Sequence, residues 1–311
     1  MKRLLFFILF LLSLFFMIPY MLTVSISKLQ EKHMVDLNTY HSGYTVKISE
    51  KNVDMEQFIA GILPTTISLE KKEEVLKAQA VILRTQIRKK MGDNKTILAK
   101  ELPYQYEDDN VLKKKIGAEN FVAKNKKRER AVIDTLGKCL VYNDVLIDAY
   151  YHELSVGTTL DGQEWFQKEI PYLKEKSAFN DTESDDYVDT REYTYGKVVE
   201  ILENKLKIKI TTDTAEKSLT IIDATKNGYV RKIQAGTSKI SGTRFANCFN
   251  LPSANFYFEH YDGKFRILTL GKGSGLGMSQ NTANEMAEKE KTYEQILKYF
   301  FPKTKIKAFS E

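Results

Sequence analysis

The chain has 311 residues, of which 42% are hydrophobic and 28% are charged, and its formal net charge is +6 at pH 7. This composition excludes a disordered chain and leaves enough residues for a large core, either as one domain or as a core with an inserted subdomain. The small positive excess does not indicate nucleic-acid binding and suits a surface that works against anionic wall polymers or lipid headgroups.

The N-terminal segment predicts a membrane anchor. Lys2 and Arg3 precede an almost unbroken apolar run over residues 4–24, which is long enough to cross a bilayer as a helix with its positive end in the cytoplasm. A cleaved signal peptide is the alternative, because Ser25 and Ser27 loosely resemble its cleavage site, although the run exceeds the usual core of such peptides. We therefore expect a single-pass anchor over residues 1–27 in the cytoplasmic membrane, a juxtamembrane connector over 28–49, and an extracytoplasmic remainder.

Two helices are expected next. After a short strand over residues 44–48, the pattern predicts a helix over Met55–Ile62 that ends before Pro64. Residues 69–91 then predict a strong amphipathic helix, with Ser68 as its N-cap and Gly92 at its end. The small residues within this helix would let it pack closely against a sheet.

The middle of the chain combines charged segments with a hairpin signal. Residues 107–136 carry basic clusters, for which a solvated helix face and a binding patch for teichoic acid or phospholipid both remain open. Residues 139–151 predict a hairpin that turns at Asn143-Asp144 and leads into the polar residues 152–159, a strand end of the kind that carries binding sites. The acidic residues 181–189 are expected in a surface loop.

The last third of the chain predicts β-structure followed by helices. Residues 195–210 mix helix and strand signals, and residues 218–270 predict strands with turns at Lys226-Asn-Gly228 and Asp262-Gly263. The glycine-rich residues 271–277 open a helix near Met278, and they either cradle an anion or pack closely against a strand. An amphipathic helix pair follows. We therefore predict an α+β fold in which the amphipathic helix packs on mixed β-structure, with a β-rich subdomain inserted at about residues 190–270.

The cysteines and histidines indicate no local metal site. Cys139 and Cys248 lie in apolar, strand-like surroundings, so a disulfide and a pair of buried thiols both remain open. The sequence has no Cys-x-x-Cys or His-x-x-x-His spacing. Its histidines are scattered over His33, His41, His152 and His260. We expect neither a metal nor a cofactor.

Several blocks, in the same order, resemble one protein family. Glu74–Thr85 is similar to the "EALKAQAVAART" segment of the stage II sporulation protein D and amidase-enhancer (SpoIID/LytB) family. The further blocks that resemble this family are Ala149–Thr159 ("AYYHSTSGGKT"), Trp165 with Pro171–Leu173 ("W…PYL"), Ile240–Phe245 with Leu251–Phe256 ("LSG…F…LGLRSTNF"), Gly275–Gln280 with Ala283 ("GHGVGMSQWGA"), and Tyr293–Lys305 ("YKEILKYYYPGTK"). The resemblance implies a membrane-anchored SpoIID-like domain over residues 50–308.

The resemblance also implies an activity and a departure from it. Active members bind peptidoglycan and cleave its glycan strands as lytic transglycosylases. One carboxyl group protonates the glycosidic oxygen and then takes a proton from the muramic C6 hydroxyl, which gives a 1,6-anhydro end. In the family this Glu lies in "GVVAAEMP", and the gapless alignment places Thr66 there. The family's glycine-loop histidine falls at Ser274, and its "HSTSGG" becomes His152–Gly157.

Two carboxylates are candidates to replace the missing acid. Glu70 lies about one helical turn beyond Thr66, and Glu153 lies in the strand-end motif. The alternatives are a partner of the helix dipole for Glu70 and an exposed loop acid for Glu153. Six side chains are expected to line the groove and to hydrogen-bond sugar hydroxyls, N-acetyl groups or the peptide stem: Gln79, Arg84, His152, Ser155, Ser279 and Gln280. Gln79 and Arg84 also suit buried structural roles.

Three functions therefore remain open. The first is a noncatalytic, peptidoglycan-binding protein with a degenerate transglycosylase site, the second is an active transglycosylase that uses Glu153 or Glu70, and the third is an activator of a partner amidase. The resemblance implies septal wall remodelling during engulfment in sporulation, whereas a vegetative wall role would leave the same residues. The partners it implies are peptidoglycan glycan strands, the membrane, and the stage II sporulation proteins M and P. No nucleic acid is expected.

Overall fold

The computed structural model describes residues 15, 17, 18, 21 and 36–309. Most of the expected anchor over residues 1–27, and residues 28–35 of the connector, therefore lie outside the described residues. Among the residues that are described, no helix is both long and apolar enough to span a membrane. The chain divides into two units, Met1–His41 and Ser42–Glu311. In the first unit, Asp36 closes a turn, because its carbonyl accepts the N–H groups of Thr39 and Tyr40 at 3.0 Å.

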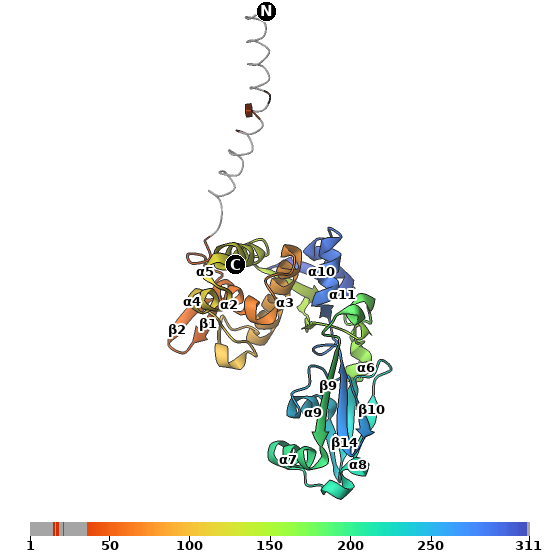
Figure 1. Ribbon diagram of the computed structural model, residues 1–311. Coiled ribbons are helices and arrows are strands. Elements are labelled where there is room, and N and C mark those ends of the chain that lie inside the picture. The colour runs from red at the N-terminus through yellow and green to blue at the C-terminus, as the bar shows by residue number, and fades with distance from the viewer. Residues whose placement is uncertain (1–14, 16, 19–20, 22–35, 310–311) are drawn as a thin grey trace, which may run out of the picture. The chain divides into compact units, whose positions relative to one another are not determined.

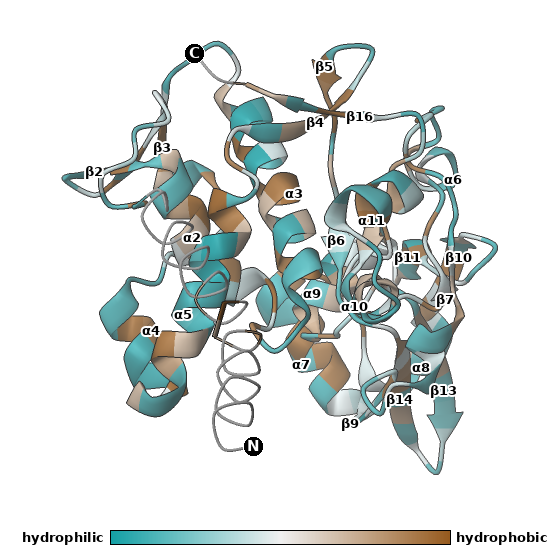
Figure 2. Ribbon diagram, turned by 90° about the horizontal axis from the view of Figure 1, so that it is seen from above, coloured by the Kyte–Doolittle hydropathy of each residue, from teal (hydrophilic) through white to brown (hydrophobic). Residues whose placement is uncertain are grey.

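One end of the second unit is built around a central helix, α3 (Glu73–Met91). This helix contacts α2 (Met55–Thr66), α5 (Ala118–Ile133), α10 (Gln280–Glu288) and α11 (Tyr293–Phe300), and α4 (Asp109–Ile116) packs on α5. Figure 2 shows α3 between these neighbours. A helix that is covered on several sides must be apolar around most of its circumference, and Ala78, Ala80 and Leu83 are all fully buried.

Two helix boundaries differ from the sequence prediction. α2 continues through Pro64 to Thr66, because a proline in the last turn interrupts little of the ladder, and the Ile67 N–H still donates to the Leu63 carbonyl at 3.0 Å. α3 begins at Glu73 and not at residue 69. The expected N-cap, Ser68, instead accepts the N–H of Glu70 at 3.3 Å within the preceding turn.

The N-terminal strands and the predicted hairpin form two small sheets. β1 (Thr45–Ile48) pairs with β2 (Lys51–Asp54) in antiparallel and with β3 (Thr96–Leu98) in parallel orientation. β4 (Lys138–Tyr142) and β5 (Val145–Leu146) form the hairpin, and β16 (Lys305–Ala308) pairs with the other edge of β4. The turn residues Asn143 and Asp144 have φ values of 48° and 64°, as a type I′ turn requires, so the hairpin prediction is confirmed.

The other end of the second unit is β-rich (Figure 1). One sheet has the order β10 (Leu219–Ala224), β11 (Val230–Ala235), β12 (Ser238–Ser241), and the other has the order β13 (Phe256–Tyr261), β14 (Lys264–Leu270), β9 (Val188–Thr194). Three helices accompany them, α7 (Tyr195–Leu206), α8 (Ala215–Ser218) and α9 (Gly242–Cys248). A hydrophobic cluster of residues between Val198 and Ile267 fills this part. The strands from β10 to β14 and their turns lie where strands were predicted, whereas β9 and α9 were not predicted.

The state of the two cysteines resolves one open alternative. Cys139 and Cys248 are both free and buried, so they are buried thiols rather than a disulfide. Burial raises the pKa of the Cys139 thiol to about 11, which keeps it protonated.

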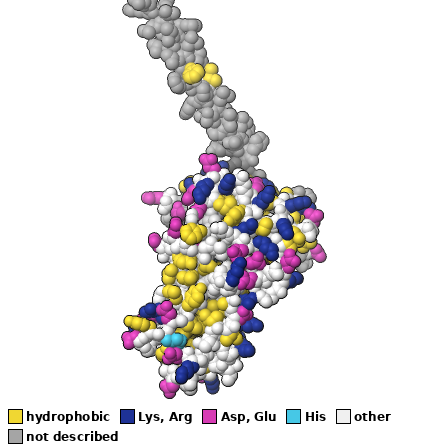
Figure 3. Space-filling view, turned by 90° about the vertical axis from the view of Figure 1, so that its right-hand side faces the viewer, with side chains coloured by type: hydrophobic (Ala, Val, Ile, Leu, Met, Phe, Trp, Pro, Cys, Tyr) yellow, Lys and Arg dark blue, Asp and Glu magenta, His cyan; other side chains and the backbone are white. Residues whose placement is uncertain are grey.

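On the face in Figure 3, basic and acidic side chains are interspersed. Part of the basic segment 107–136 turns inward, because Arg128 is 3% exposed and pairs with Asp109 at 2.6 Å.

The glycine-rich residues 271–277 pack against a strand end. Gly277 has φ 70°, and a Cβ added there would lie 2.1 Å from the Tyr150 carbonyl oxygen. Gly273 has φ 100°, and its Cβ would lie 2.7 Å from the Cβ of His152. Close backbone packing, one of the two predicted roles, is therefore what the structure shows. The helix that follows begins at Gln280 and not near Met278, because Met278 and Ser279 form a short strand, β15.

Candidate functional site

The candidate site is a junction between the strand-end motif and the start of α10. β15 (Met278–Ser279) pairs in parallel with β6 (Tyr151–His152), so that Ser279 lies opposite His152. Ser279 also caps α10, because its hydroxyl accepts the N–H of Thr282 at 3.2 Å. Two motifs that are more than 100 residues apart in the chain therefore form one unit.

Gln280 connects this junction to the position of the missing acid. Its Nε2 donates to the carbonyl of Thr66 at 2.8 Å and to Oε1 of Gln79 at 3.2 Å. Thr66 is half-buried at the end of α2, where its hydroxyl donates to the Leu63 carbonyl at 3.0 Å. Burial raises the pKa of Tyr151 to about 12, against the opposing effect of a side-chain hydrogen bond with Thr66. Thr66, Gln79, Tyr151 and Gln280 thus meet at one place.

A buried carboxylate, Asp181, joins the two motifs. It lies in a short 3₁₀ helix (Phe179–Glu183) and is 0% exposed. Its Oδ2 accepts the backbone N–H of Ser155 and the hydroxyl of Ser279, each at 2.7 Å. Its Oδ1 accepts the hydroxyl of Thr282 at 2.8 Å and the amide of Asn281 at 3.3 Å. The prediction that residues 181–189 form a surface loop is therefore wrong at Asp181, whose partners are distant in sequence.

Replacing Asp181 by asparagine is expected to lower the free energy of unfolding by about 1–3 kcal/mol, because an amide cannot accept all four hydrogen bonds and turns an N–H₂ group toward buried donors. Urea denaturation measures the change. Asp185→Asn is the matched control, since Asp185 is exposed in the same segment and should change the free energy of unfolding by less than about 0.5 kcal/mol. Equal stability of the two variants would contradict this role of Asp181.

His152 is held as a neutral ring. It is 2% exposed, and burial lowers its pKa to about 4. Its Nδ1 lies 3.0 Å from the Leu276 carbonyl, so Nδ1 carries the proton and donates it. Nε2 is then a buried acceptor, and it has no hydrogen-bond partner among the described residues. The hydroxyl of Ser155 is buried in the same way.

Arg84 lies outside this junction. It is 0% exposed and makes a two-pronged ion pair with the equally buried Glu56, with Nε to Oε1 at 2.7 Å and Nη2 to Oε2 at 2.6 Å. Its Nη1 also donates to the Lys138 carbonyl at 3.1 Å. Five residues along a helix amount to a rotation of about 140°, so Arg84 faces away from Gln79. Arg84 therefore takes the structural role that the sequence left open, and it does not line a groove.

The two candidate substitutes for the missing acid are engaged elsewhere. Glu70 has a side chain that is 73% exposed and pairs with Lys124, which lowers the pKa of Glu70. It precedes α3, which begins at Glu73, so it does not lie in the first helical turn where the alternative role of a dipole partner placed it. Glu153 is 53% exposed at its side chain, and Lys272 binds it at 3.2 Å while also binding Asp186 at 2.8 Å.

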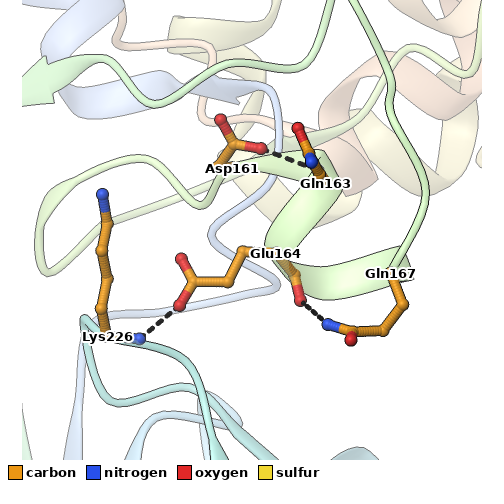
Figure 4. A pocket seen from close by; sticks show the side chains of 5 residues that line it. All are labelled: Asp161, Gln163, Glu164, Gln167 and Lys226. Atoms are coloured by element: carbon orange, nitrogen blue, oxygen red, sulfur yellow. Dashed lines mark hydrogen bonds between the residues drawn. The ribbon is translucent and has the colours of Figure 1, made fainter.

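A separate polar pocket of about 430 Å³ lies beside α6 (Gly162–Phe166). Figure 4 shows its lining, Asp161, Gln163, Glu164, Gln167 and Lys226. These groups bond one another, since Asp161 accepts the Gln163 N–H at 2.7 Å and Gln167 donates to the Glu164 carbonyl at 2.8 Å. The pocket contains none of the predicted site residues. In the described part of the chain, no group of His, Cys, Asp or Glu is arranged to hold a metal ion.

The structure thus brings together five of the predicted side chains and leaves three apart. Gln79, His152, Ser155, Ser279 and Gln280 share the junction, while Arg84, Glu70 and Glu153 do not. These features define an α+β protein with a glycine loop packed on a strand end and a buried polar junction beside the end of α2. Thr66, which is half-buried, belongs to this junction through its hydrogen bond with Gln280.

Comparisons with known proteins identify the family. The model of the stage II sporulation protein (SpoIID) family matches residues 44–142. Stage II sporulation protein D of Bacillus subtilis is 30% identical over 270 residues, which cover 84% of this chain and 77% of that protein. The protein of the same name from Bacillus amyloliquefaciens is 29% identical, over 81% of this chain and 74% of its own length. The amidase enhancer of Bacillus subtilis is 25% identical over 299 residues, which cover 81% of this chain and 40% of that protein. The chain belongs to the stage II sporulation protein D family, as its motifs predicted.

Proposed function

We propose that this chain is a membrane-anchored, peptidoglycan-binding protein of sporulation and wall remodelling in which the glycan-cleaving site is degenerate. The family and the names of its relatives support a role in sporulation and the cell wall. The anchor is inferred from the apolar residues 4–24, which would hold the folded part of the chain outside the cytoplasm.

One observation carries the proposal of a degenerate site. The position at which the family resemblance expects the general acid is occupied by Thr66, which still belongs to the polar junction through Gln280 and Tyr151. A threonine hydroxyl is far too weak an acid to protonate a glycosidic oxygen near neutral pH. Neither nearby carboxylate suits that task, because Glu70 is held ionised by Lys124 and Glu153 pairs with Lys272. An active transglycosylase that uses Glu153 or Glu70 is therefore the weaker alternative.

A second function, activation of a partner amidase, is favoured by one relative. The amidase enhancer of Bacillus subtilis matches 81% of this chain. A wall-binding protein without its own acid would act in this way by bringing the amidase to its substrate. The stage II sporulation proteins M and P are the partners that the family resemblance implies, and this activity would appear only when such a partner is present.

Wall binding is tested by sedimentation of the full chain, kept soluble with a mild detergent, with purified sacculi from which teichoic acids have been removed. We expect the chain to sediment with the sacculi and to be released by an excess of soluble glycan strands. The chain should remain in the supernatant when sacculi are replaced by cellulose, an uncharged control polymer. A chain that stays in the supernatant with sacculi would overturn the proposed function.

A further inference from the structure

Three lysines in the basic segment 107–136 are exposed and have no partner. Lys113 and Lys114 lie in α4, and Lys126 lies in α5. Within the described part of the chain, none of these three free lysines forms a side-chain ion pair or hydrogen bond. The stretch Val111–Lys126 contains five lysines and a single acid, so its net charge is +4. Such a surface favours an anionic partner.

The acids of this region do not neutralise the free lysines. Glu107 pairs with Lys115 at 3.2 Å, and Asp109 pairs with Arg128 at 2.6 Å. Glu119, the one acid of the stretch, is exposed near the start of α5. Three ammonium groups therefore stand against one exposed carboxylate.

Each of the two helices also exposes a valine one turn before a free lysine. Val111 is 47% exposed and precedes Lys114 by three residues, and Val122 is 72% exposed and precedes Lys126 by four. Residues three or four apart lie on the same face of a helix. An apolar side chain beside lysines on an exposed helix face is typical of helices that lie at a membrane surface.

The free lysines lie outside the pocket beside their helices. α4 packs on α5, and α5 packs on α3, so that α4 lies at the outer edge (Figure 2). The pocket of about 230 Å³ next to them is lined in part by Leu112, Lys115, Ile116 and Lys124, but by none of the free lysines. This pocket cannot gather the free charges around a small anion, whereas an extended anionic layer can meet them together.

The proposed anchor would keep this surface close to a membrane. The apolar run covers residues 4–24, and the second unit begins at Ser42. The 17 residues between them, 25–41, span at most about 60 Å when fully extended. A tethered group meets its target at a high effective concentration, so that individually weak contacts suffice for docking.

We propose that the α4–α5 surface (Val111, Lys113, Lys114, Val122 and Lys126) docks on the anionic lipid headgroups of the membrane that holds the anchor. This inference rests on the anchor in the proposed function. A teichoic acid also offers phosphates, but only a bilayer offers an apolar layer to the two valines. Docking would hold the second unit against the membrane and limit which layers of the wall it reaches.

The test is fluorescence quenching in the full chain, reconstituted into lipid nanodiscs. Ala123→Cys places an exposed thiol on α5 for an environment-sensitive label, because Cys139 and Cys248 are buried. The quencher is a nitroxide near the headgroup end of a lipid acyl chain. We expect quenching in discs that contain phosphatidylglycerol and none in discs of phosphatidylcholine alone. High salt should weaken the quenching, since it screens exposed charges.

Replacing all three free lysines by glutamine should lower the docking equilibrium constant roughly 100-fold, which abolishes the quenching. A control variant with the same change in charge should keep it, because its lysines are exposed at the β-rich end of the second unit: Lys209→Gln, Lys217→Gln and Lys239→Gln. The same label placed by Ile222→Cys, on β10 at that end, should not be quenched.

Three results would overturn docking on lipid. These are equal quenching in the two kinds of disc, unchanged quenching in the triple glutamine variant, and loss of quenching when poly(glycerol phosphate) is added at the phosphate concentration of the lipid, which would assign the surface to a wall polymer. A chain that enters the discs but shows no quenching contradicts the α4–α5 surface alone. A chain that does not enter the discs contradicts the proposed anchor and this inference with it.

Discussion

Replacing Thr66 by glutamate is expected to yield 1,6-anhydro-muramic ends from purified glycan strands, at a rate about 10²–10⁴ times that of Thr66→Gln. The side chain at this position is half-buried at the last residue of α2. The negative end of the helix dipole disfavours an ionised carboxylate there, which raises its pKa toward the value that a general acid needs. Tyr151 and Gln280 already surround the position with hydrogen-bonding groups.

The glutamine variant is the matched control, because it has nearly the same shape as glutamate and no acidic proton. Mass spectrometry of the soluble products measures the 1,6-anhydro ends in both variants. If a folded Thr66→Glu variant still binds the wall but yields no more of these ends than Thr66→Gln, the missing acid is not the only departure that matters. Ser274, at the position of the family's glycine-loop histidine, would then be the next residue to restore.

Replacing Glu56 by glutamine is expected to lower the free energy of unfolding by about 3–5 kcal/mol. Glu56 and Arg84 are both 0% exposed, and the change removes the carboxylate that accepts from both Nε and Nη2 of the guanidinium. A buried charge that loses its counter-charge keeps its desolvation cost without the compensating attraction. Urea denaturation, followed by far-ultraviolet circular dichroism, measures the loss.

An exposed pair gives the contrast for this prediction. Glu192 pairs with Arg266 at 2.7 Å on the open face of the sheet β13-β14-β9, where both side chains are partly exposed. Glu192→Gln should therefore cost less than about 1 kcal/mol. A double variant, Glu56→Gln with Arg84→Met, should recover part of the loss because no unpaired charge remains. A cost for Glu56→Gln as small as that for Glu192→Gln would contradict the structural role of the pair.

Local patterns predicted the elements whose signals lie within a few residues. The hairpin at Asn143-Asp144 and the turn at Asp262-Gly263 follow from residues that tolerate a positive φ, and both occur. The start of α3 was predicted too early because Ser68 resembles an N-cap. The turn before α3 is instead held from outside, since Lys127 of α5 donates to the Leu69 carbonyl at 2.9 Å.

The candidate site was predicted in its motifs but not in its connections. His152, Ser155, Ser279 and Gln280 were found because they lie in blocks that resemble the family. Asp181 was missed because nothing near it in sequence distinguishes a buried carboxylate from an exposed one, and its four partners lie at residues 155 and 279–282. Glu56 was missed for the same reason, since it lies 28 residues from Arg84.

We propose that this member of the family keeps the junction but has lost the acid that cleaves glycan. The most direct test is mass spectrometry of the soluble products after incubation of the unmodified full chain with glycan strands stripped of stem peptides. We predict no 1,6-anhydro-muramic ends above those of a heat-inactivated sample, while the same chain sediments with the wall. The appearance of such ends, and their loss in Glu153→Gln or Glu70→Gln, would contradict this proposal and show an enzyme whose acid has moved.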